Sequence, residues 1–291
     1  MTEQVADNKN QSGVLGWVNK RYPVREFWTQ HMSGYYAPKN FNFWYYFGAF
    51  SLLVFVMQII SGIWLVMEYT PTADASFGSV QHIMREVRYG WLLRFMHTTG
   101  ASAFFVVIYL HMYRGLIYGS YQKPRELVWL VGMFIYAILL LEAFTVYVLP
   151  WGQMSYWGAA VITSFASAIP FGIGNAILEW VRGGYGITGV TLHRFFSLHV
   201  IAIPLLLCIF IFVHLVALHY VGSNNPDGID IKEKKDSKGV PLDGIAFHPY
   251  YTVKDLFGVG VFLIVFATVL FFAPTMHGVF LEADNFIAAN P

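Results

Sequence analysis

The feature that most constrains this chain is an apolar stretch, Leu92 to Tyr118, that contains two histidines, His97 and His111. The stretch is long enough to cross a bilayer as a helix. Because a helix rises about 1.5 Å and turns about 100° per residue, the two rings lie about 21 Å apart and within about 40° of one face. An ionisable side chain within a span is costly and usually faces a bundle interior. Two histidines on one face therefore need a shared explanation.

The composition is that of a membrane protein. Hydrophobic residues make up 56% of the 291 residues and charged residues only 12%, whereas soluble domains carry about 25% charged residues. The net charge of +1 gives no sign of a nucleic-acid partner. A single cysteine, Cys208, excludes an intrachain disulfide and a multi-cysteine metal site, which leaves histidine as the obvious metal ligand.

The apolar runs predict an all-α membrane protein, in which a four-helix transmembrane bundle is joined by a fifth spanning helix. Residues 1–12 are expected to form a disordered tail, and residues 13–24 an interfacial amphipathic helix anchored by Trp17 and Tyr22. A short surface helix is expected near residues 80–87. About forty apolar residues after the third span predict short helices packed over one membrane face. The five expected spans are Phe43–Met67, Leu92–Tyr118, Leu127–Leu149, Phe195–Tyr220 and Lys254–Phe272.

The basic residues predict the orientation of these spans. Every lysine near a span end falls on one side, whereas the opposite side carries only arginines. Since lysine and arginine concentrate on the cytoplasmic side, the N-terminus is expected to be cytoplasmic. The opposite side carries Arg85, Arg88, Arg94, Arg182 and Arg194. The expected segments are 1–34 (tail and interfacial helix), 35–223 (four-helix bundle), 224–252 (cytoplasmic loop), and 253–291 (fifth spanning helix and start of a C-terminal region).

A second pair of histidines, His199 and His214, lies in the fourth span. Their spacing of fifteen residues leaves them about 60° out of register on an ideal helix. Pro204 lies between them, and a proline removes a backbone hydrogen bond and bends or bulges a helix. One extra residue at such a kink restores the register. Since spans two and four run the same way, His97 matches His199 in depth, and His111 matches His214.

Four histidines at matching depths favour two bis-histidine metal sites about 20 Å apart. A lone membrane histidine is more often a hydrogen-bonded interior residue, and the pairing argues against that alternative. Structural zinc requires four ligands at each site. Two axial imidazoles without other donors suit six-coordinate haem iron, which favours electron transfer.

Arginines and glycines near the histidines agree with haem. Arg94, Arg114 and Arg194 lie near the histidines on the side of the membrane surface, where guanidinium groups suit haem propionates. Their alternative role is snorkelling to the interface. Glycines fit flat macrocycles pressed against helix backbones, or ordinary packing of small residues between helices. The glycines concerned are Gly48, Gly62 and Gly132.

The chain closely resembles the cytochrome b subunit of quinol–cytochrome c oxidoreductase, in its bacterial form and without the C-terminal spans. The resemblance is carried by the histidine pairs and by RFMHTTGAS, YVLPWGQMSYWGA, TLHRFFSLH, HLVALHYVGSNNP and FHPYYTVKDL. It implies two b haems, a low-potential one on His97 and His199 near the outer face and a high-potential one on His111 and His214 near the inner face.

The resemblance also implies two sites for ubiquinone or menaquinone. The outer, quinol-oxidising site would use Tyr147, Met154, Trp157 and Gly158, and the inner, quinone-reducing site His219, Ser223, Lys254 and Asp255. Quinone reduction takes up protons, so titratable groups suit the inner site, although solvation alone also explains each polar residue at a membrane boundary. The implied partners are a Rieske iron–sulfur protein, a cytochrome c-type subunit, membrane lipid and a second copy of the complex. The implied location is the bacterial inner membrane.

The sequence departs from the family at several positions. Val146 stands where the family usually has a fourth glycine, and its isopropyl group is expected to crowd the outer haem. The fifteen-residue histidine spacing is like that of plastid-type and many bacterial forms. The chain stops at Pro291, before the family's Pro-Glu-Trp-Tyr motif, so the outer site is expected to be incomplete in this sequence. Glu142, within the third span, is interpreted as a buried hydrogen-bonded carboxyl rather than a proton carrier.

Two other functions remain open from the residues. One is a dihaem membrane anchor that links a peripheral dehydrogenase to quinone, against which the long apolar outer loop argues. The other is a transporter or channel that moves protons through intramembrane histidines, which explains neither the matched depths nor the arginines.

Overall fold

The computed structural model describes residues 13–276 and 283–290, so the predicted tail at residues 1–12 lies outside the described residues. The chain divides into two compact units. One comprises Met1–Tyr46 and Gly222–Val261, and the other Phe47–Val221 and Phe262–Pro291.

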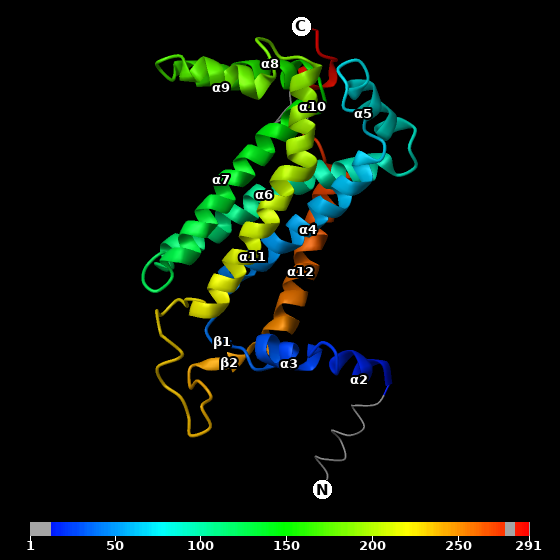
Figure 1. Cartoon of the computed structure of the whole chain (residues 1–291). Coiled ribbons are helices and arrows are strands. Elements are labelled where there is room, and N and C mark those ends of the chain that lie inside the picture. The colour runs from blue at the N-terminus through cyan, green and yellow to red at the C-terminus, as the bar shows by residue number, and fades with distance from the viewer. Residues whose placement is uncertain (1–12, 277–282, 291) are drawn as a thin grey trace. The chain divides into compact units, whose positions relative to one another are not determined.

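The larger unit contains the helices of the predicted bundle (Figure 1). Helix α7 packs along α11, and the histidine-bearing helices α6 and α11 approach each other less closely. Apart from the short α10, their sequences are apolar on nearly every side, as expected for helices surrounded by lipid and by one another. These helices are α4 (Tyr46–Val66), α6 (Gly90–Ile117), α7 (Glu126–Val148), α10 (Gly189–Ser197) and α11 (Ile203–Val221).

Within the described residues, five helices are long and apolar enough to cross a membrane, as the sequence predicted. The fourth span begins earlier than expected, because α10, a π-helical turn and α11 form one stretch from Gly189 to Val221. The fifth, α12 (Phe247–Phe272), also begins earlier, and contains a kink at His248. The all-α membrane fold is therefore confirmed.

The expected kink in the fourth span is a π-helical turn at Leu198–Ala202. It lies directly before Pro204, which has no N–H to give to the carbonyl four residues earlier. A π-helical turn inserts one residue into an α-helix. This insertion offsets the fifteen-residue spacing between His199 and His214.

Short helices fill the apolar connection after α7, as predicted. Figure 1 shows α8 (Gln153–Ser164) and α9 (Ile173–Arg182) running across the ends of α7 and α10. The surface helix expected near residues 80–87 is α5 (Ser76–Arg85). A buried apolar cluster joins the α7, α8 and α10 segments; it comprises Val148, Leu149, Trp151, Ala159, Ile187, Leu192 and Phe195.

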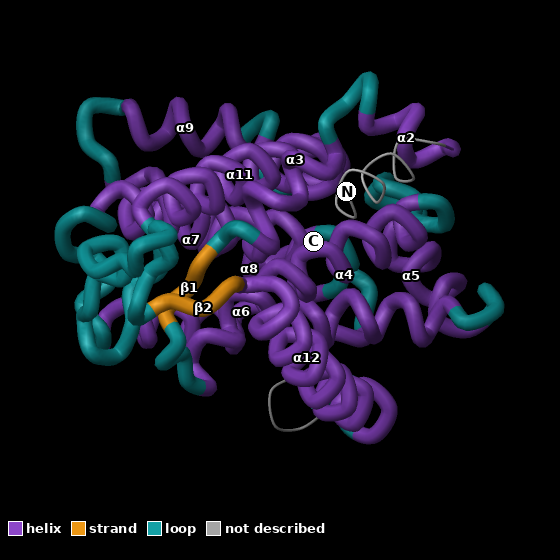
Figure 2. Tube along the Cα trace, turned by 90° about the horizontal axis from the view of Figure 1, so that it is seen from below, coloured by secondary structure: helices purple, strands orange, loops and turns teal. Residues whose placement is uncertain are grey.

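The smaller unit contains two short N-terminal helices, α2 (Gly13–Asn19) and α3 (Val24–Trp28), where the sequence predicted one helix. Pro23 explains the break, because its nitrogen cannot donate the hydrogen bond that would continue the first helix. The predicted anchors Trp17 and Tyr22 are both exposed. Two short antiparallel strands that the sequence analysis missed, β1 (Tyr36–Pro38) and β2 (Gly244–Ala246), pair in this unit (Figure 2).

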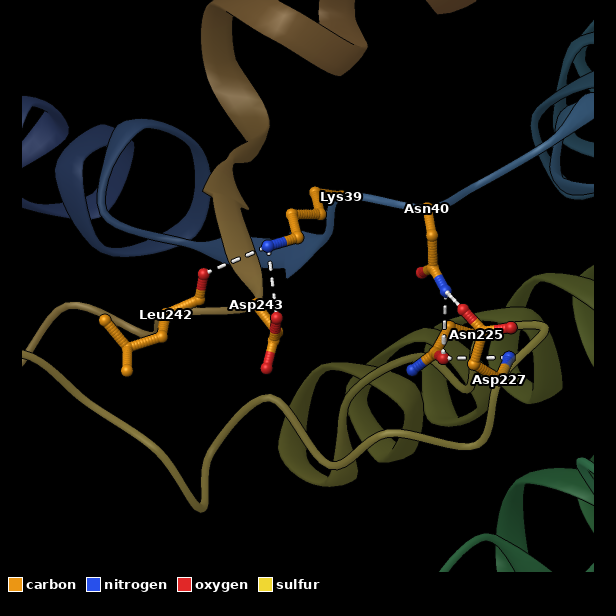
Figure 3. A network of polar contacts seen from close by, with 6 residues as sticks. All are labelled: Lys39, Asn40, Asn225, Asp227, Leu242 and Asp243. Atoms are coloured by element: carbon orange, nitrogen blue, oxygen red, sulfur yellow. Dashed lines mark hydrogen bonds and ion pairs between the residues drawn. The ribbon is translucent and has the colours of Figure 1, made fainter.

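Polar side chains after β1 hold the loop that follows α11 (Figure 3). Lys39 Nζ lies 3.1 Å from Asp243 Oδ1, and Asn40 Nδ2 donates to Asp227 Oδ2 at 2.6 Å and to Asn225 Oδ1 at 3.3 Å. Asn225 is buried, and its amide donates to the carbonyl of Ile229. The hydrophilic connection is therefore held by side-chain contacts, both within itself and with Lys39 and Asn40 after β1.

Candidate functional site

The four histidines of α6 and the fourth span form two pairs, each with one ring edge toward the face of the other. The ring centroids of His97 and His199 lie 6.2 Å apart, and those of His111 and His214 lie 6.3 Å apart. We call these the 97/199 pair and the 111/214 pair. The pairing in depth that the sequence predicted is the arrangement in the structure.

Both separations suit a metal ion between two imidazoles. A metal–imidazole bond is about 2.0–2.1 Å long, and the ring centre lies about 1.1 Å beyond the nitrogen, which gives centroids about 6.3 Å apart. Edge-to-face packing of aromatic rings covers the same range of distance. Two pairs with nearly equal separation, each on the same two helices, favour the metal interpretation.

The Nδ1 atom of His97 is held by Ser61, which leaves Nε2 for a metal. Ser61 Oγ lies 2.9 Å from His97 Nδ1 and donates its own proton to the carbonyl of Met57 at 2.6 Å. Since the hydroxyl proton is already used, the serine oxygen accepts the Nδ1–H of the ring. Such a contact fixes the tautomer and the ring plane of a metal ligand.

Each of the three predicted glycines makes room for one histidine ring. A Cβ on Gly48 would lie 3.3 Å from His111 Cε1, and a Cβ on Gly62 would lie 3.3 Å from His97 Cε1. A Cβ on Gly132 would lie 3.3 Å from Cε1 of His214. The nearest side-chain neighbours of these glycines are the imidazoles, and their expected contact with a macrocycle stays a prediction. Glycine is needed because the ring packs directly against the helix backbone.

In the described part of the chain, no group of three or more His, Cys, Asp or Glu side chains gathers around one point. A zinc centre built from four protein donors is therefore absent from these residues. Two imidazoles per site, without a third protein donor in the described residues, leave the other coordination positions to a planar cofactor such as haem.

Comparisons with known proteins agree with this donor set. The family model described as "Cytochrome b/b6/petB" matches residues 32–222. The chain belongs to the cytochrome b family.

Two named relatives align with nearly the whole of this chain. The "Cytochrome b" of Allochromatium vinosum is 57% identical over 281 residues, which cover 95% of this chain and 67% of the relative. The "Cytochrome b" of Rickettsia prowazekii is 50% identical over 284 residues, which cover 98% of this chain and 68% of the relative. A solved structure described as "Hyperthermophilic respiratory Complex III" has a TM-score of 0.86 and 40% identity, and the match covers 96% of this chain and 71% of that one.

Membership of the cytochrome b family makes the chain a multi-pass membrane protein that carries b-type haem. The residues present fit that group. The paired imidazoles have the separation of axial ligands, and three glycines give the rings their space against the helices. The Nδ1 contact of His97 leaves Nε2 as its metal-binding atom.

The three arginines predicted to bind haem propionates in this cytochrome b family chain differ in position. Arg94 and Arg114 are half-buried on α6, three residues from His97 and His111 toward the two helix ends. Arg194 is exposed, and its guanidinium group donates to the backbone carbonyl of Trp180 on α9. Propionate binding by Arg94 and Arg114 stays a prediction. Propionate binding by Arg194 also stays a prediction, and its guanidinium group is directed toward α9.

Two of the predicted quinol-oxidising residues lie together at the junction of α7 and α8. A Cβ on Gly158 would lie 3.2 Å from Tyr147 Cε1, so the tyrosine ring packs on the α8 backbone. Trp157 is exposed and Met154 is half-buried on the same helix. Because Met154 and Gly158 are four residues apart, they lie on one face of α8. The role of these residues stays a prediction.

The predicted quinone-reducing residues belong to different units. His219 lies near the end of α11 in the larger unit, whereas Ser223, Lys254 and Asp255 lie in the smaller unit. Lys254 Nζ donates to the hydroxyl of Tyr250 at 2.7 Å and lies 4.2 Å from the centre of its ring. The assembly of these four residues into one site stays a prediction.

The sequence analysis missed a network of hydroxyl groups beside the junction of α7 and α8. Tyr69 Oη donates to the carbonyl of Leu149 at 2.7 Å, and Ser76 Oγ donates to the same oxygen at 2.6 Å. Burial raises the pKa of Tyr69 to about 12, and the hydrogen bond with Ser76 opposes part of that rise. The tyrosine is therefore a neutral donor throughout the physiological pH range. Its partner lies eighty residues away, so no local pattern indicated the contact.

We expect Tyr69→Phe to lower the free energy of unfolding by about 1 kcal/mol, because a buried carbonyl loses one donor. Thermal unfolding of the detergent-solubilised protein measures the change. The folded-state pKa is raised, so the tyrosine's contribution is complete below pH 10 and falls as the pH rises toward 12. The Tyr69→Phe variant should lack this fall in the free energy of unfolding at alkaline pH. Tyr185→Phe is the control, since that side chain is 88% exposed, and an equal loss in both variants would contradict the assignment.

Proposed function

We propose that this chain is the electron-transfer subunit of a quinol:cytochrome c oxidoreductase and binds two b-type haems. The 97/199 pair would hold the outer, low-potential haem, and the 111/214 pair would hold the inner, high-potential haem. The observation that carries the proposal is the presence of two imidazole pairs with ring separations of 6.2 and 6.3 Å on one pair of parallel helices. Fourteen residues of α6 set the pairs about 21 Å apart along its axis.

Each haem, when bound, would supply one-electron transfer between the two faces of the membrane. The chain itself would hold and orient the ligands. Ser61 fixes the ring of His97, and the glycines let the imidazoles lie against the helices. Arg94 and Arg114 would bind the propionates near the two surfaces, and Arg194 would do so only after leaving its contact with Trp180.

Two quinone sites complete the proposed activity, with ubiquinone or menaquinone as the substrate. Quinol would be oxidised near Tyr147, Met154, Trp157 and Gly158, where the packing of Tyr147 on Gly158 supports a common surface. Quinone would be reduced near His219, Ser223, Lys254 and Asp255. Electrons from one quinol would divide between an iron–sulfur partner and the haem pair, which moves charge across the membrane as in a Q cycle.

This cytochrome b family chain works within a multisubunit complex, as the similarity to a respiratory complex III structure supports. The proposed partners are a Rieske iron–sulfur protein, a cytochrome c-type subunit and a second copy of the complex. The proposed location is the bacterial inner membrane with a cytoplasmic N-terminus. The proposed segments are a tail and interfacial helix (1–34), a dihaem bundle (35–223), a cytoplasmic loop (224–252) and a fifth span with the start of a C-terminal region (253–291).

The dehydrogenase-anchor alternative receives no support, since both the family match and the matched complex point to cytochrome b. A proton channel gives no reason for two ring pairs of nearly equal separation, or for the three glycines behind them.

Redox difference spectra of the purified complex test the proposal. We expect two b-type haems per chain that are reduced at different potentials, because the two pairs have different neighbours. Quinol should reduce both, and a ligand of the outer quinol site should block reduction from that side. A preparation with one b haem, or with none, would overturn the dihaem assignment.

A further inference from the structure

A carboxyl group in the third span contacts one of the paired histidines. Glu142 lies on α7 with 14% of its side chain exposed, and its Oε1 atom lies 2.9 Å from Nδ1 of His199. Its second oxygen, Oε2, is buried without a hydrogen-bond partner in the described part of the chain. An ionisable group within a span is costly and calls for a specific partner. The partner here is a histidine of the 97/199 pair.

Glu142 occupies a position on its helix that is equivalent to the positions of two backbone carbonyls near His97 and His214. His97 packs on Gly62 and faces the carbonyl of Gln58, which lies four residues before that glycine. His214 packs on Gly132 and approaches the carbonyl of Val128, again four residues earlier. In both cases a backbone carbonyl one turn before the glycine approaches the histidine ring, since residues four apart are neighbours on a helix.

Val146 stands where the family usually has a fourth glycine of this kind. Glu142 lies four residues before Val146. A Cβ at each of the three glycines already meets an imidazole at 3.3 Å. The two methyl groups of a valine therefore leave no room for a ring packed on the backbone in the same way. The side-chain oxygen of residue 142 extends farther than the backbone carbonyl of that residue and reaches Nδ1 of His199.

We infer that Glu142 is a positioning residue of the 97/199 pair, whose carboxyl oxygen accepts the Nδ1–H of His199 and thereby orients the ring and lowers the potential of the haem bound there. The inference rests on the proposed dihaem function. An acceptor on the second nitrogen makes a ligating imidazole a stronger electron donor, and ligand hydrogen bonding is one means by which a protein sets a haem potential. The 2.9 Å separation of Oε1 and Nδ1 is that of a hydrogen bond, while the angle at Nδ1 lies outside ideal geometry.

The 111/214 pair has no such partner. The Nδ1 atoms of His111, His199 and His214 all lack a hydrogen bond of good geometry with the described residues, and of these three only His199 has a carboxyl oxygen at 2.9 Å. The carboxyl group therefore distinguishes one pair from the other, and its removal should shift the potential of one haem only.

Two substitutions in the intact complex test the inference by redox titration of the haem spectra. Glu142→Leu removes the acceptor and should raise the potential of the 97/199 haem by about 59 mV, a tenfold change in its reduction equilibrium. Glu142→Gln keeps an oxygen acceptor and should shift the potential by less. The paramagnetic resonance signal of the oxidised 97/199 haem should change in the leucine variant, because the ring is released, and should return toward the native signal in the glutamine variant.

Glu126→Gln is the matched control, because Glu126 is exposed in the first turn of the same helix and should leave both haems unchanged. Loss of the 97/199 haem alone in the leucine variant would also support the inference. Two haems that both keep their potentials and signals, or that shift equally, would overturn it while leaving the proposed function intact. Absence of two b haems from the unmodified complex would instead overturn the proposed function.

Discussion

Substitution of His111 by leucine is expected to remove one b-type haem and to leave the other in place. Leucine has no nitrogen donor, and His214 alone cannot supply both axial ligands. The 97/199 pair lies about 21 Å away along α6 and keeps both of its imidazoles. Haem b extracted per chain should therefore fall from two to one, and the remaining haem should still be reduced by quinol but should not pass its electron inward. Quantitative extraction together with quinol-driven reduction measures both effects.

His82→Leu is the control for this experiment. His82 lies on α5, about half exposed, where it contacts Glu86 at the surface. The control should retain both haems, because His82 belongs to neither pair. Retention of two haems in the His111 variant would refute the ligand assignment. Loss of both haems from a complex that is otherwise assembled would refute the independence of the two pairs.

The sequence predicted much of the bundle because its signals repeat along single helices. Apolar runs of span length located five helices, and the fourteen-residue spacing of His97 and His111 placed two rings on one face of α6. The fifteen-residue spacing of His199 and His214, which is out of register on an ideal helix, correctly indicated an inserted residue near Pro204. The structure contains this residue as a π-helical turn. Periodicity and proline chemistry act within a few turns, so they can be read locally.

Features that depend on distant contacts could not be read in this way. The acceptor for Tyr69 is eighty residues away, and β1 pairs with a strand about two hundred residues later. Glu142 was recognised as a buried carboxyl, yet its partner became evident only when α7 and the fourth span were packed together. The glycines were predicted to lie against a macrocycle, which stays a prediction, and the packing of an imidazole ring on each of them became evident only from the folded structure.

A second large effect is expected from Gly62→Val, which should displace the ring of His97 and remove or destabilise the 97/199 haem alone. A Cβ at this position lies 3.3 Å from His97 Cε1, so even alanine requires the ring to move by a few tenths of an ångström. Valine adds two further methyl groups to a well-packed contact, which costs about 1–3 kcal/mol. We expect Gly62→Ala to shift the spectrum of that haem and Gly62→Val to abolish most of its absorbance, as measured in difference spectra.

Gly260→Val separates this local effect from a general effect of valine within a spanning helix. Gly260 lies on α12, and a Cβ there meets nothing within 4 Å in the described structure, so both haems should persist in this control. Equal haem loss in the two valine variants would show that the space behind His97 is not the cause. The chain itself contains a valine at the fourth position, Val146, and there His199 is held by a side-chain carboxyl. Gly62→Val places the same crowding behind His97, whose Nδ1 is held by Ser61 Oγ at 2.9 Å, while the amide of Gln58 one turn earlier packs against Gly100. We therefore expect valine to be tolerated on α7 and not on α4.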